Sequence, residues 1–373
     1  MSTPTQIPDL PFRTAAVLGA GLMGRLVALT LAQAGCRVSV FDAAGPDADG
    51  AAARVAAAML APLAESAVAP PSVVRMGHYA LERWPQLIAS LAQPVFFQRE
   101  GTLVLWHRQD APEARRLAGV LAHTRESVPE LPAMQRLDGS GIEALEPALR
   151  QRFAEGLLLP EEGQLDNRAL LAALLASLQA MPEVRLHWNS PHSLDDFAPG
   201  TPGQADCVID CRGFGARAEW PGLRGVRGEV VRVHAPEVAL RRPTRLVHPR
   251  YPIYIAPKPG DVFVIGATEI ESDDMSPASV RSTLELLSAA YTVHSGFAEA
   301  RILEIATQCR PTLPDNLPAF RRPRPGVLQV NGLYRHGFMI APAMLDMTME
   351  LLSQGRCTLA DRFGLAAEPE RAE

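Results

Sequence analysis

Three glycines near the start of the chain have the spacing that binds the phosphates of a dinucleotide. Gly19, Gly21 and Gly24 follow the pattern G-x-G-x-x-G directly after the apolar run 15–18, which reads as a buried strand. The first glycine permits a tight turn, the second leaves room for a pyrophosphate, and the third lets a helix pack close to a sheet. The start of that helix would direct free N–H groups at the phosphates.

An acidic residue lies where such a motif needs one. Gly35 is placed to end the helix, residues 38–41 read as a second strand, and Asp42 closes it 18 residues after Gly24. A carboxylate in this position accepts hydrogen bonds from an adenosine ribose. This order predicts a dinucleotide site, and an ordinary glycine turn in a βαβ unit is the alternative. The motif alone does not distinguish NAD from FAD.

The composition bounds the class of protein. The chain has 373 residues, of which 47% are hydrophobic, and a net charge of −5. Since one domain usually has about 100–200 residues, we expect two domains. The charge does not favour a nucleic-acid partner or an acidic membrane surface. No apolar run reaches the roughly 18 residues that span a bilayer, so we expect no integral membrane segment and a cytoplasmic protein.

The cysteines suggest neither disulfides nor a metal. They are five in number and widely spread, which favours a reducing compartment. Cys207 and Cys211 lie in or beside an apolar strand without a second Cys/His pair. We therefore expect core thiols there and no metal site.

Hydrophobic patterns predict helices and strands along the whole chain. Helices are expected over 72–92, 111–127, 140–146, 166–181, 276–290 and 342–352. Strands are expected over 96–97, 102–106, 157–160, 184–188, 205–211, 228–234, 251–256, 262–267, 300–310 and 327–331. Their order predicts two domains that interleave in the sequence.

Some local expectations are more specific. Pro85 should kink or break its helix, and Asp166 or Asn167 should cap the helix that follows. Residues 157–160 suit a sheet edge. The small residues of 51–62 favour a helix packed on the sheet over a segment that approaches a bulky ligand.

Several segments together resemble one family. They occur in order and comprise 16–42, 58–62 (AMLAP), 210–213 (DCRG), 227–231 (RGEVV), 254–257 (YIAP), 265–268 (IGAT), 310–315 (RPTLPD) and 334–337 (YRHG). Over about residues 14–353, the chain is similar to FAD-dependent glycine oxidases of the ThiO type of thiamine biosynthesis. These enzymes belong to the D-amino-acid oxidase and sarcosine oxidase superfamily.

The resemblance implies an α/β (mixed α+β) fold. A Rossmann-like FAD-binding domain of the p-hydroxybenzoate hydroxylase and D-amino-acid oxidase type would be interleaved with a mixed-sheet substrate domain. The expected ranges are 14–84, 150–218 and 300–360 for the FAD-binding domain, 85–149 and 219–299 for the substrate domain, and 1–13 and 361–373 for flexible termini. FAD is expected rather than NAD, because the second glycine loop faces the flavin in this family.

The residues expected at the cofactor lie in the two glycine loops, at the end of the second strand and in the matching segments. They are Gly19, Gly21, Leu22, Met23, Gly24, Asp42, Ala58, Met59, Gly213, Gly332, Tyr334, Arg335, His336, Gly337, Phe338 and Met339. Cys309 lies near the region where sarcosine oxidases attach flavin covalently. Its register differs here, so we expect non-covalent FAD.

Four residues match the substrate pocket of the family or depart from it. Arg310 is the expected carboxylate-binding residue, with an ion pair to Asp315 as the alternative. Tyr254 would reach the same carboxylate, or else be an ordinary strand aromatic. Arg335 would lie near the flavin, or else bond backbone carbonyls. Glu269 is a departure from an often apolar position, and it would either pair with the substrate ammonium or point to solvent.

The resemblance implies a reaction and its partners. Glycine, O2 and water would give glyoxylate, ammonia and hydrogen peroxide through an imine, which a thiazole synthase partner would receive. Sarcosine or D-amino-acid oxidation, a dehydrogenase with another electron acceptor, and a flavin-binding module without turnover are the alternatives. The preferred substrate and homo-oligomer formation stay open.

Overall fold

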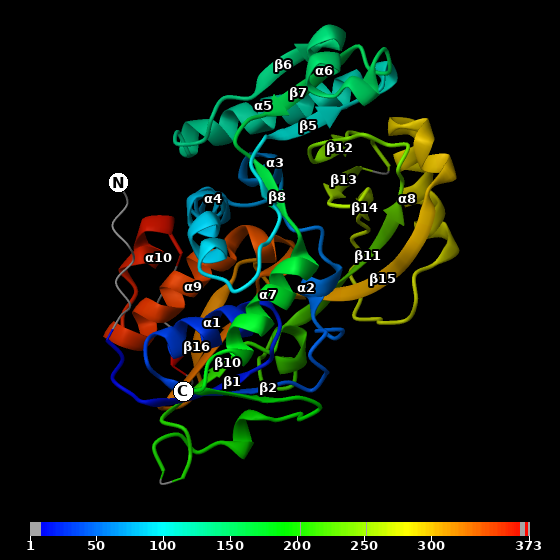
Figure 1. The fold of residues 1–373 in the computed structure, drawn as a ribbon. Helices are drawn as coiled ribbons and strands as arrows, with labels where there is room; N and C mark the ends of the chain where they lie inside the picture. Colours follow the sequence, from blue (N-terminus) through cyan, green and yellow to red (C-terminus); the bar gives the residue numbers. More distant parts are fainter. Residues whose placement is uncertain (1–8, 202, 251, 366–369, 372–373) are drawn as a thin grey trace.

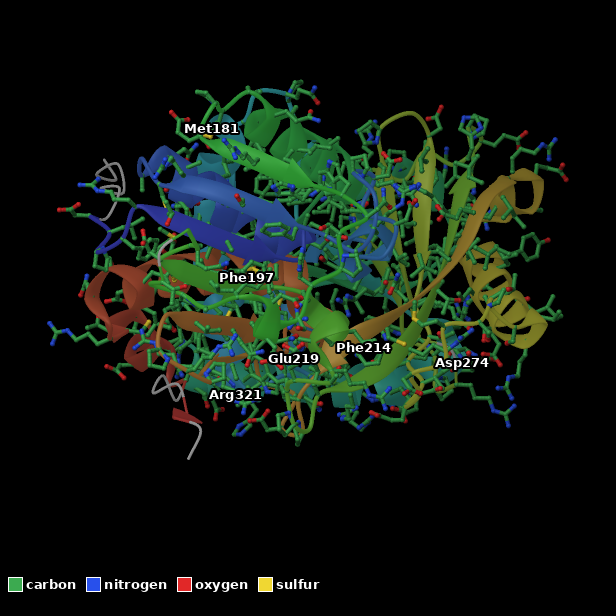
Figure 2. All side chains as sticks on the ribbon, turned by 90° about the horizontal axis from the view of Figure 1, so that it is seen from below. Met181, Phe197, Phe214, Glu219, Asp274 and Arg321 are labelled. Atoms are coloured by element: carbon green, nitrogen blue, oxygen red, sulfur yellow. The ribbon has the colours of Figure 1, made fainter. Side chains whose placement is uncertain are left out.

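The computed structural model describes residues 9–201, 203–250, 252–365 and 370–371. It contains two large sheets with helices packed around them (Figure 1). In the view from below, they lie next to each other, with Phe214 and Glu219 near the place where they meet (Figure 2). This mixed α/β architecture agrees with the expected fold class.

The first sheet contains the glycine-rich motif. Among the described residues its strand order is β18-β16-β17-β10-β1-β2-β9, and every pair is parallel except β16–β17. Both faces of β1 are buried, which explains its continuous apolar run. The strands are β1 Thr14–Leu18, β2 Arg37–Phe41, β9 Val184–His187, β10 Cys207–Asp210, β16 Ala319–Arg322, β17 Val327–Asn331 and β18 Glu370–Arg371.

Helices pack on this sheet through the larger core. That core contains residues of β1 together with residues of α1 (Leu22–Gln33), α7 (Asn167–Gln179), α9 (Gly337–Gln354) and α4 (Pro71–Ala89). The side chain of Asp166 accepts hydrogen bonds from two backbone N–H groups of α7, so the predicted cap is confirmed. Gly35 follows α1 with a φ of +81°, as a helix-ending glycine should.

The second sheet is mostly antiparallel. Its order is β15-β11-β14-β13-β12-β5-β7-β6, and β12 and β5 form its one parallel pair among the described residues. The strands are β5 Thr102–Leu105, β6 Gln135–Asp138, β7 Glu155–Leu159, β11 Arg224–His234, β12 Thr244–Leu246, β13 Ile253–Lys258, β14 Val262–Gly266 and β15 Arg301–Thr312.

A second core lies on one face of this sheet, where α8 contributes Leu286 and Ala290. The opposite face is turned toward the glycine loops. A small third sheet has the order β3-β8-β4. Its strands occur where the chain passes from one large sheet to the other. The remaining elements are β3 Met59–Leu60, β4 Phe97–Gln98, β8 Gly163–Leu165, α2 Ala52–Val55, α3 Pro62–Glu65, α5 Ala111–Ser127, α6 Gly139–Leu145, α8 Val280–Val293 and α10 Thr358–Phe363.

Prolines interrupt neither long helix. Of the kink or break expected at Pro85, the break is wrong, because α4 continues through it, and the kink stays a prediction. The helix expected from 342 begins at Gly337, and Pro342 lies inside it. A proline leaves the carbonyl four residues earlier without its helical donor. Here that carbonyl, of Phe338, accepts a hydrogen bond of 2.9 Å from the buried indole N–H of Trp84.

Three further expectations were wrong. The strand predicted at an edge, β7, lies between β5 and β6, because the apolar run cannot reveal strands that pair from elsewhere. The helix favoured over 51–62 is only α2, followed by β3 and the start of α3. The helix expected from 276 begins at Val280, after a Ser279 cap.

The expected domain boundaries also need correction. β7 lies in the second sheet although residues 150–218 were expected with the first, and the same holds for β15 in the range 300–360. Helix α4 crosses the boundary expected at 84. We propose instead a division that follows the two sheets.

The termini are less loose than expected. Leu10 and Phe12 pack against the larger core, whereas residues 1–8 lie outside the described residues. Within 361–373, the first residues complete α10, Leu365 is buried, and β18 pairs with β16; residues 366–369 and 372–373 lie outside the described residues.

The packing of α1 on the glycine loop gives a stability prediction. A Cβ on Gly24 would lie 1.8 Å from the carbonyl oxygen of Gly19, and backbone cannot move away as a flexible side chain can. We expect Gly24→Ala to lower the free energy of unfolding by about 3 kcal/mol, the upper end of the usual cost of overpacking. Gly45→Ala, whose Cβ would meet nothing within 4 Å, is the matched control. Equal urea midpoints for the two variants would contradict the close packing.

Candidate active site

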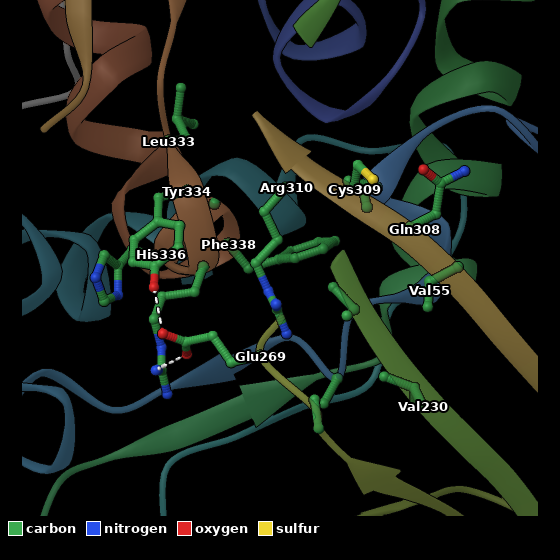
Figure 3. Close-up of a pocket in the computed structure, with 18 of the residues that line it drawn as sticks. Val55, Val230, Glu269, Gln308, Cys309, Arg310, Leu333, Tyr334, His336 and Phe338 are labelled. Atoms are coloured by element: carbon green, nitrogen blue, oxygen red, sulfur yellow. Dashed lines mark hydrogen bonds and ion pairs between the residues drawn. The ribbon is translucent and has the colours of Figure 1, made fainter. Parts of the chain in front are cut away.

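A cavity of about 1550 Å³ lies between the glycine loops and the second sheet. It opens at the carboxyl ends of the parallel strands β1, β2 and β10, where α/β sheets bind their ligands. Figure 3 shows part of its lining, with Arg310 from the second sheet, Glu269 from the segment after β14, and Tyr334 and His336 from the loop before α9.

The first glycine loop has the geometry that its sequence predicts. Gly19 has a φ of +88°, and a Cβ there would lie 2.7 Å from the backbone of Arg212. A Cβ on Gly21 would meet only Ala51, at 3.5 Å, so backbone is open to the cavity at this point. Asp42 accepts hydrogen bonds from the backbone N–H of Ala20 at 2.5 Å and of Ala44 at 2.7 Å. Its carboxylate therefore also shapes the loop.

The second glycine loop is tied to the strand end at β10. The side-chain amide of Asn331 donates a 2.9 Å hydrogen bond to the carbonyl of Gly213. Of the residues expected at the cofactor, all line the cavity except Gly24 and Gly332. Gly24 packs α1 on its loop, and a Cβ on Gly332 would lie 2.7 Å from Leu313, so both glycines act in packing.

Three cavity residues other than glycine have left-handed backbone. Ala48 has a φ of +59°, Ala58 a φ of +52° and Tyr334 a φ of +50°. Such conformations cost of order 1–3 kcal/mol and persist where the surroundings enforce them, often at functional sites. Residues 51–53 and 55–59, expected in a sheet-packed helix, line the cavity together with Ala61, which favours the ligand-facing alternative for them.

Two glycines of the second sheet receive side chains from neighbouring strands. A Cβ on Gly228 would lie 2.5 Å from a guanidinium nitrogen of Arg310, and a Cβ on Gly266 would lie 2.5 Å from the hydroxyl of Tyr254. Both side chains thus lie flat on the sheet, at the cavity wall. Neither glycine was predicted as a site residue, although a glycine in a strand often marks a close approach of another group.

Arg310 keeps its charge available. Its guanidinium donates to the carbonyls of Thr268 at 3.0 Å and Arg227 at 3.3 Å, and no carboxylate of the described residues pairs with it. The alternative pairing with Asp315 is absent, since that side chain accepts from the backbone N–H of Leu317. A guanidinium of this kind suits a bidentate carboxylate ligand.

A buried carboxylate, Glu65, holds two other arginines. One of its oxygens lies 2.6 Å from Arg245 and the other 3.0 Å from Nε of Arg335. Burial alone would raise the pKa of Glu65, but the two arginines outweigh it and hold the pKa well below its ordinary value. Glu65 and Arg245 were also missed, although Glu65 is the lone acid in the apolar segment 51–65.

Glu269 has two partners within the protein. Its carboxylate accepts hydrogen bonds from the hydroxyl of Tyr334 at 2.6 Å and from Nη1 of Arg335 at 2.5 Å (Figure 3). It is therefore bound within the protein even though its side chain is 44% exposed. Burial and the nearby Glu269 raise the pKa of Tyr334 to about 12, so the phenol is a proton donor at neutral pH.

Two further cavity residues are buried. Burial lowers the pKa of His336 to about 4 despite Glu65, whose oxygen lies 3.5 Å from Nδ1, so the imidazole is neutral. The Cys309 thiol donates to the carbonyl of Ser272, and burial raises its pKa. Cys207 and Cys211 are buried as well, and no group of described side chains could hold a metal ion.

A known protein family matches most of the chain. The FAD dependent oxidoreductase family matches residues 14–351. The chain belongs to this family. FAD is its cofactor, and the cavity fits it: an open backbone stretch at Gly21, the start of the 12-residue helix α1, and a carboxylate at the end of β2.

Relatives extend over most of the chain. It is 42% identical to a protein provisionally named thiamine biosynthesis oxidoreductase ThiO in Rhizobium etli, over 91% of this chain and 96% of that protein. The bifunctional protein ThiO/ThiG of Nostoc sp. is 24% identical over 91% of this chain and 52% of that protein. The crystal structure of glycine oxidase from Geobacillus kaustophilus, 23% identical, shares the fold with a TM-score of 0.77, covering 97% of this chain and all of that one. Within the described residues, helices long and apolar enough to cross a membrane are lacking.

The contact of Gly228 with Arg310 gives a binding prediction. Acetate serves here as a simple carboxylate ligand of Arg310. We expect Gly228→Ala to push the guanidinium aside and to weaken acetate binding at least tenfold, measured from the flavin absorbance of the holoenzyme. Stability should change little, because the end of a flexible side chain can move. In an Arg310→Ala background, Gly228→Ala should have no further effect on binding. Independent effects of the two substitutions would exclude this contact.

Glu162 gives a pH-dependent prediction. It is 1% exposed, its one bonded oxygen accepts from the backbone N–H of Ala64, and burial raises its pKa to about 7. The folded state therefore holds this proton better than the unfolded state, whose carboxyl has a pKa near 4.5. Stability from this group is present below that value and is lost as the pH rises to about 7.

We expect Glu162→Gln to remove this loss. The variant should be more stable than the wild type at pH 8, by up to about 3 kcal/mol, and the difference should shrink toward pH 4.5. The exposed neighbour Glu161, replaced by Gln, serves as the control. A stability difference that is constant with pH in urea denaturation would rule out the raised pKa.

Proposed function

We propose that this protein oxidises glycine to glyoxylate, with release of ammonia and hydrogen peroxide, through an imine that serves thiazole synthesis. The observation that carries the proposal is Arg310, an arginine on the cavity wall whose partners among the described residues are two backbone carbonyls. The relative from Rhizobium etli, named for thiamine biosynthesis, supports the same assignment.

The side chains around the cavity suggest how an amino acid is held. Arg310 would bind the substrate carboxylate with its free guanidinium edge, and the Tyr254 hydroxyl, which has no hydrogen-bond partner among the described residues, would donate to the same group. Burial raises the pKa of Tyr254, which keeps this proton in place. Arg335 is fixed beside them by Glu65 and Glu269.

FAD supplies the redox chemistry: when bound, it takes up the two electrons of the Cα–H bond and returns them to O2. The protein's part is to orient that bond and to exclude water. The amine must be neutral to form the imine, and its proton leaves to solvent before binding in this scheme. His336, neutral and buried, is then not required as a base.

A thiazole synthase is the partner that we propose for the imine. An imine hydrolyses in water, so delivery to the consuming enzyme is of use. The bifunctional ThiO/ThiG relative supports this proposal, since it joins a region similar to this chain to a further region. Free and buried cysteines among the described residues support a reducing compartment, the cytoplasm.

An anaerobic absorbance titration tests the reaction. We expect glycine to bleach the visible flavin band of the purified protein. Bleaching by sarcosine or D-alanine alone would move the protein to the sister oxidases. A flavin band that no amino acid bleaches would indicate a binding module without turnover.

Arg310→Ala tests the substrate assignment in the same assay. Hydrogen bonds to charged groups contribute about 1.5–3 kcal/mol each, so the loss of two should raise the glycine Kd at least a hundredfold. The bound FAD should stay at its wild-type stoichiometry. Arg321→Ala, a substitution on β16 in the first sheet, is the control. If KM and Kd for glycine stay unchanged in Arg310→Ala, Arg310 does not bind the substrate.

A further inference from the structure

Three arginines of the cavity differ in how many carboxylates they pair with. Arg335 already has two carboxylate partners, Glu65 on Nε and Glu269 on Nη1. Arg245 shares Glu65. Of these three arginines, Arg310 alone has no carboxylate partner among the described residues. The three guanidinium groups and two carboxylates leave one positive charge, which matches one substrate carboxylate.

Glu269 is held firmly in this arrangement. The residues on both sides of it are bonded to β11: Thr268 exchanges hydrogen bonds with Glu229, and Ile270 exchanges two with Arg227. Tyr334 donates to Glu269 from a left-handed backbone conformation that a tyrosine adopts only under constraint. The carboxylate therefore belongs to the built site.

We propose that Glu269 determines substrate specificity by filling the anion position beside Arg335. Because this position is taken, the pocket accepts amino acids with one carboxylate and rejects those with a second carboxylate on the amine or side chain. A second carboxylate would meet Glu269 instead of Arg335, and like charges in contact are strongly unfavourable. This inference rests on the proposed function, which supplies the amino-acid substrate.

Removal of Glu269 should free the position for a substrate group. Glu269→Ala leaves the Tyr334 hydroxyl and Nη1 of Arg335 without their acceptor. Both donors would then suit the second carboxylate of iminodiacetate, which is glycine with one further carboxymethyl group. Glu269→Gln removes the charge but keeps the shape, so it separates the charge effect from the space effect.

The test compares iminodiacetate with glycine in the holoenzyme. We expect the ratio of kcat/KM for iminodiacetate to that for glycine to rise at least tenfold in Glu269→Gln and further in Glu269→Ala. Glu271→Gln, two residues away and paired with Arg224 outside the cavity, should leave the ratio unchanged. An unchanged ratio in both Glu269 variants would overturn the proposal.

A binding measurement keeps this test separate from the proposed reaction. Malonate has two carboxylates and acetate has one, and neither is an amine that the flavin could oxidise. We expect the ratio of acetate Kd to malonate Kd, from perturbation of the flavin spectrum, to rise at least tenfold in Glu269→Ala. If glycine fails to reduce the wild-type flavin, the glycine proposal falls, and this ratio still decides on Glu269. No change in the ratio would refute its role.

Discussion

The buried carboxylate of Glu65 is the interaction on which the cavity depends. It stands at the end of α3 and holds Arg245 from β12 and Arg335 from the loop before α9. These elements are far apart in the sequence and come from both large sheets and the segment between them. A buried pair is costly to break, because the remaining charge has no compensation. Glu65 thus fixes how the second sheet faces the glycine loops.

The same wall is shaped by residues that lack side chains. Gly228 and Gly266 leave the space in which Arg310 and Tyr254 lie against the sheet. On the opposite side, Gly21 keeps backbone open to the ligand. On both walls, glycines therefore provide the space that the ligand or the neighbouring side chains occupy.

Local features could be predicted from the sequence, and pairings could not. The turn at Gly19, the cap at Asp166 and the strand at β1 depend on neighbours within a few residues, and the structure has them as expected. The interior place of β7 depends on strands that arrive from distant segments. The continuation of α9 through Pro342 depends on a tryptophan more than 250 residues earlier.

In the candidate site, too, some residues could be predicted from the sequence and their partners could not. Arg310, Tyr254 and Arg335 could be named because their segments match a family, and the structure places them on one cavity. The carboxylate that pairs with Arg335 could not be named, because Glu65 reaches this arginine only after folding. Glu269 shows the limit most clearly: its residue type was visible as a departure, but its two donors come from another element.

Charge balance explains why such partners are needed at all. Without carboxylate partners, the guanidinium groups of Arg245, Arg310 and Arg335 would repel each other on one cavity wall. A buried ion pair contributes little net stability by itself, since desolvation opposes the attraction. What the carboxylates do contribute is selectivity among these arginines: Glu65 and Glu269 together neutralise Arg245 and Arg335, and Arg310 is the one of the three that stays free for the ligand. The carboxylates thus define the substrate site as much as the arginine that binds it.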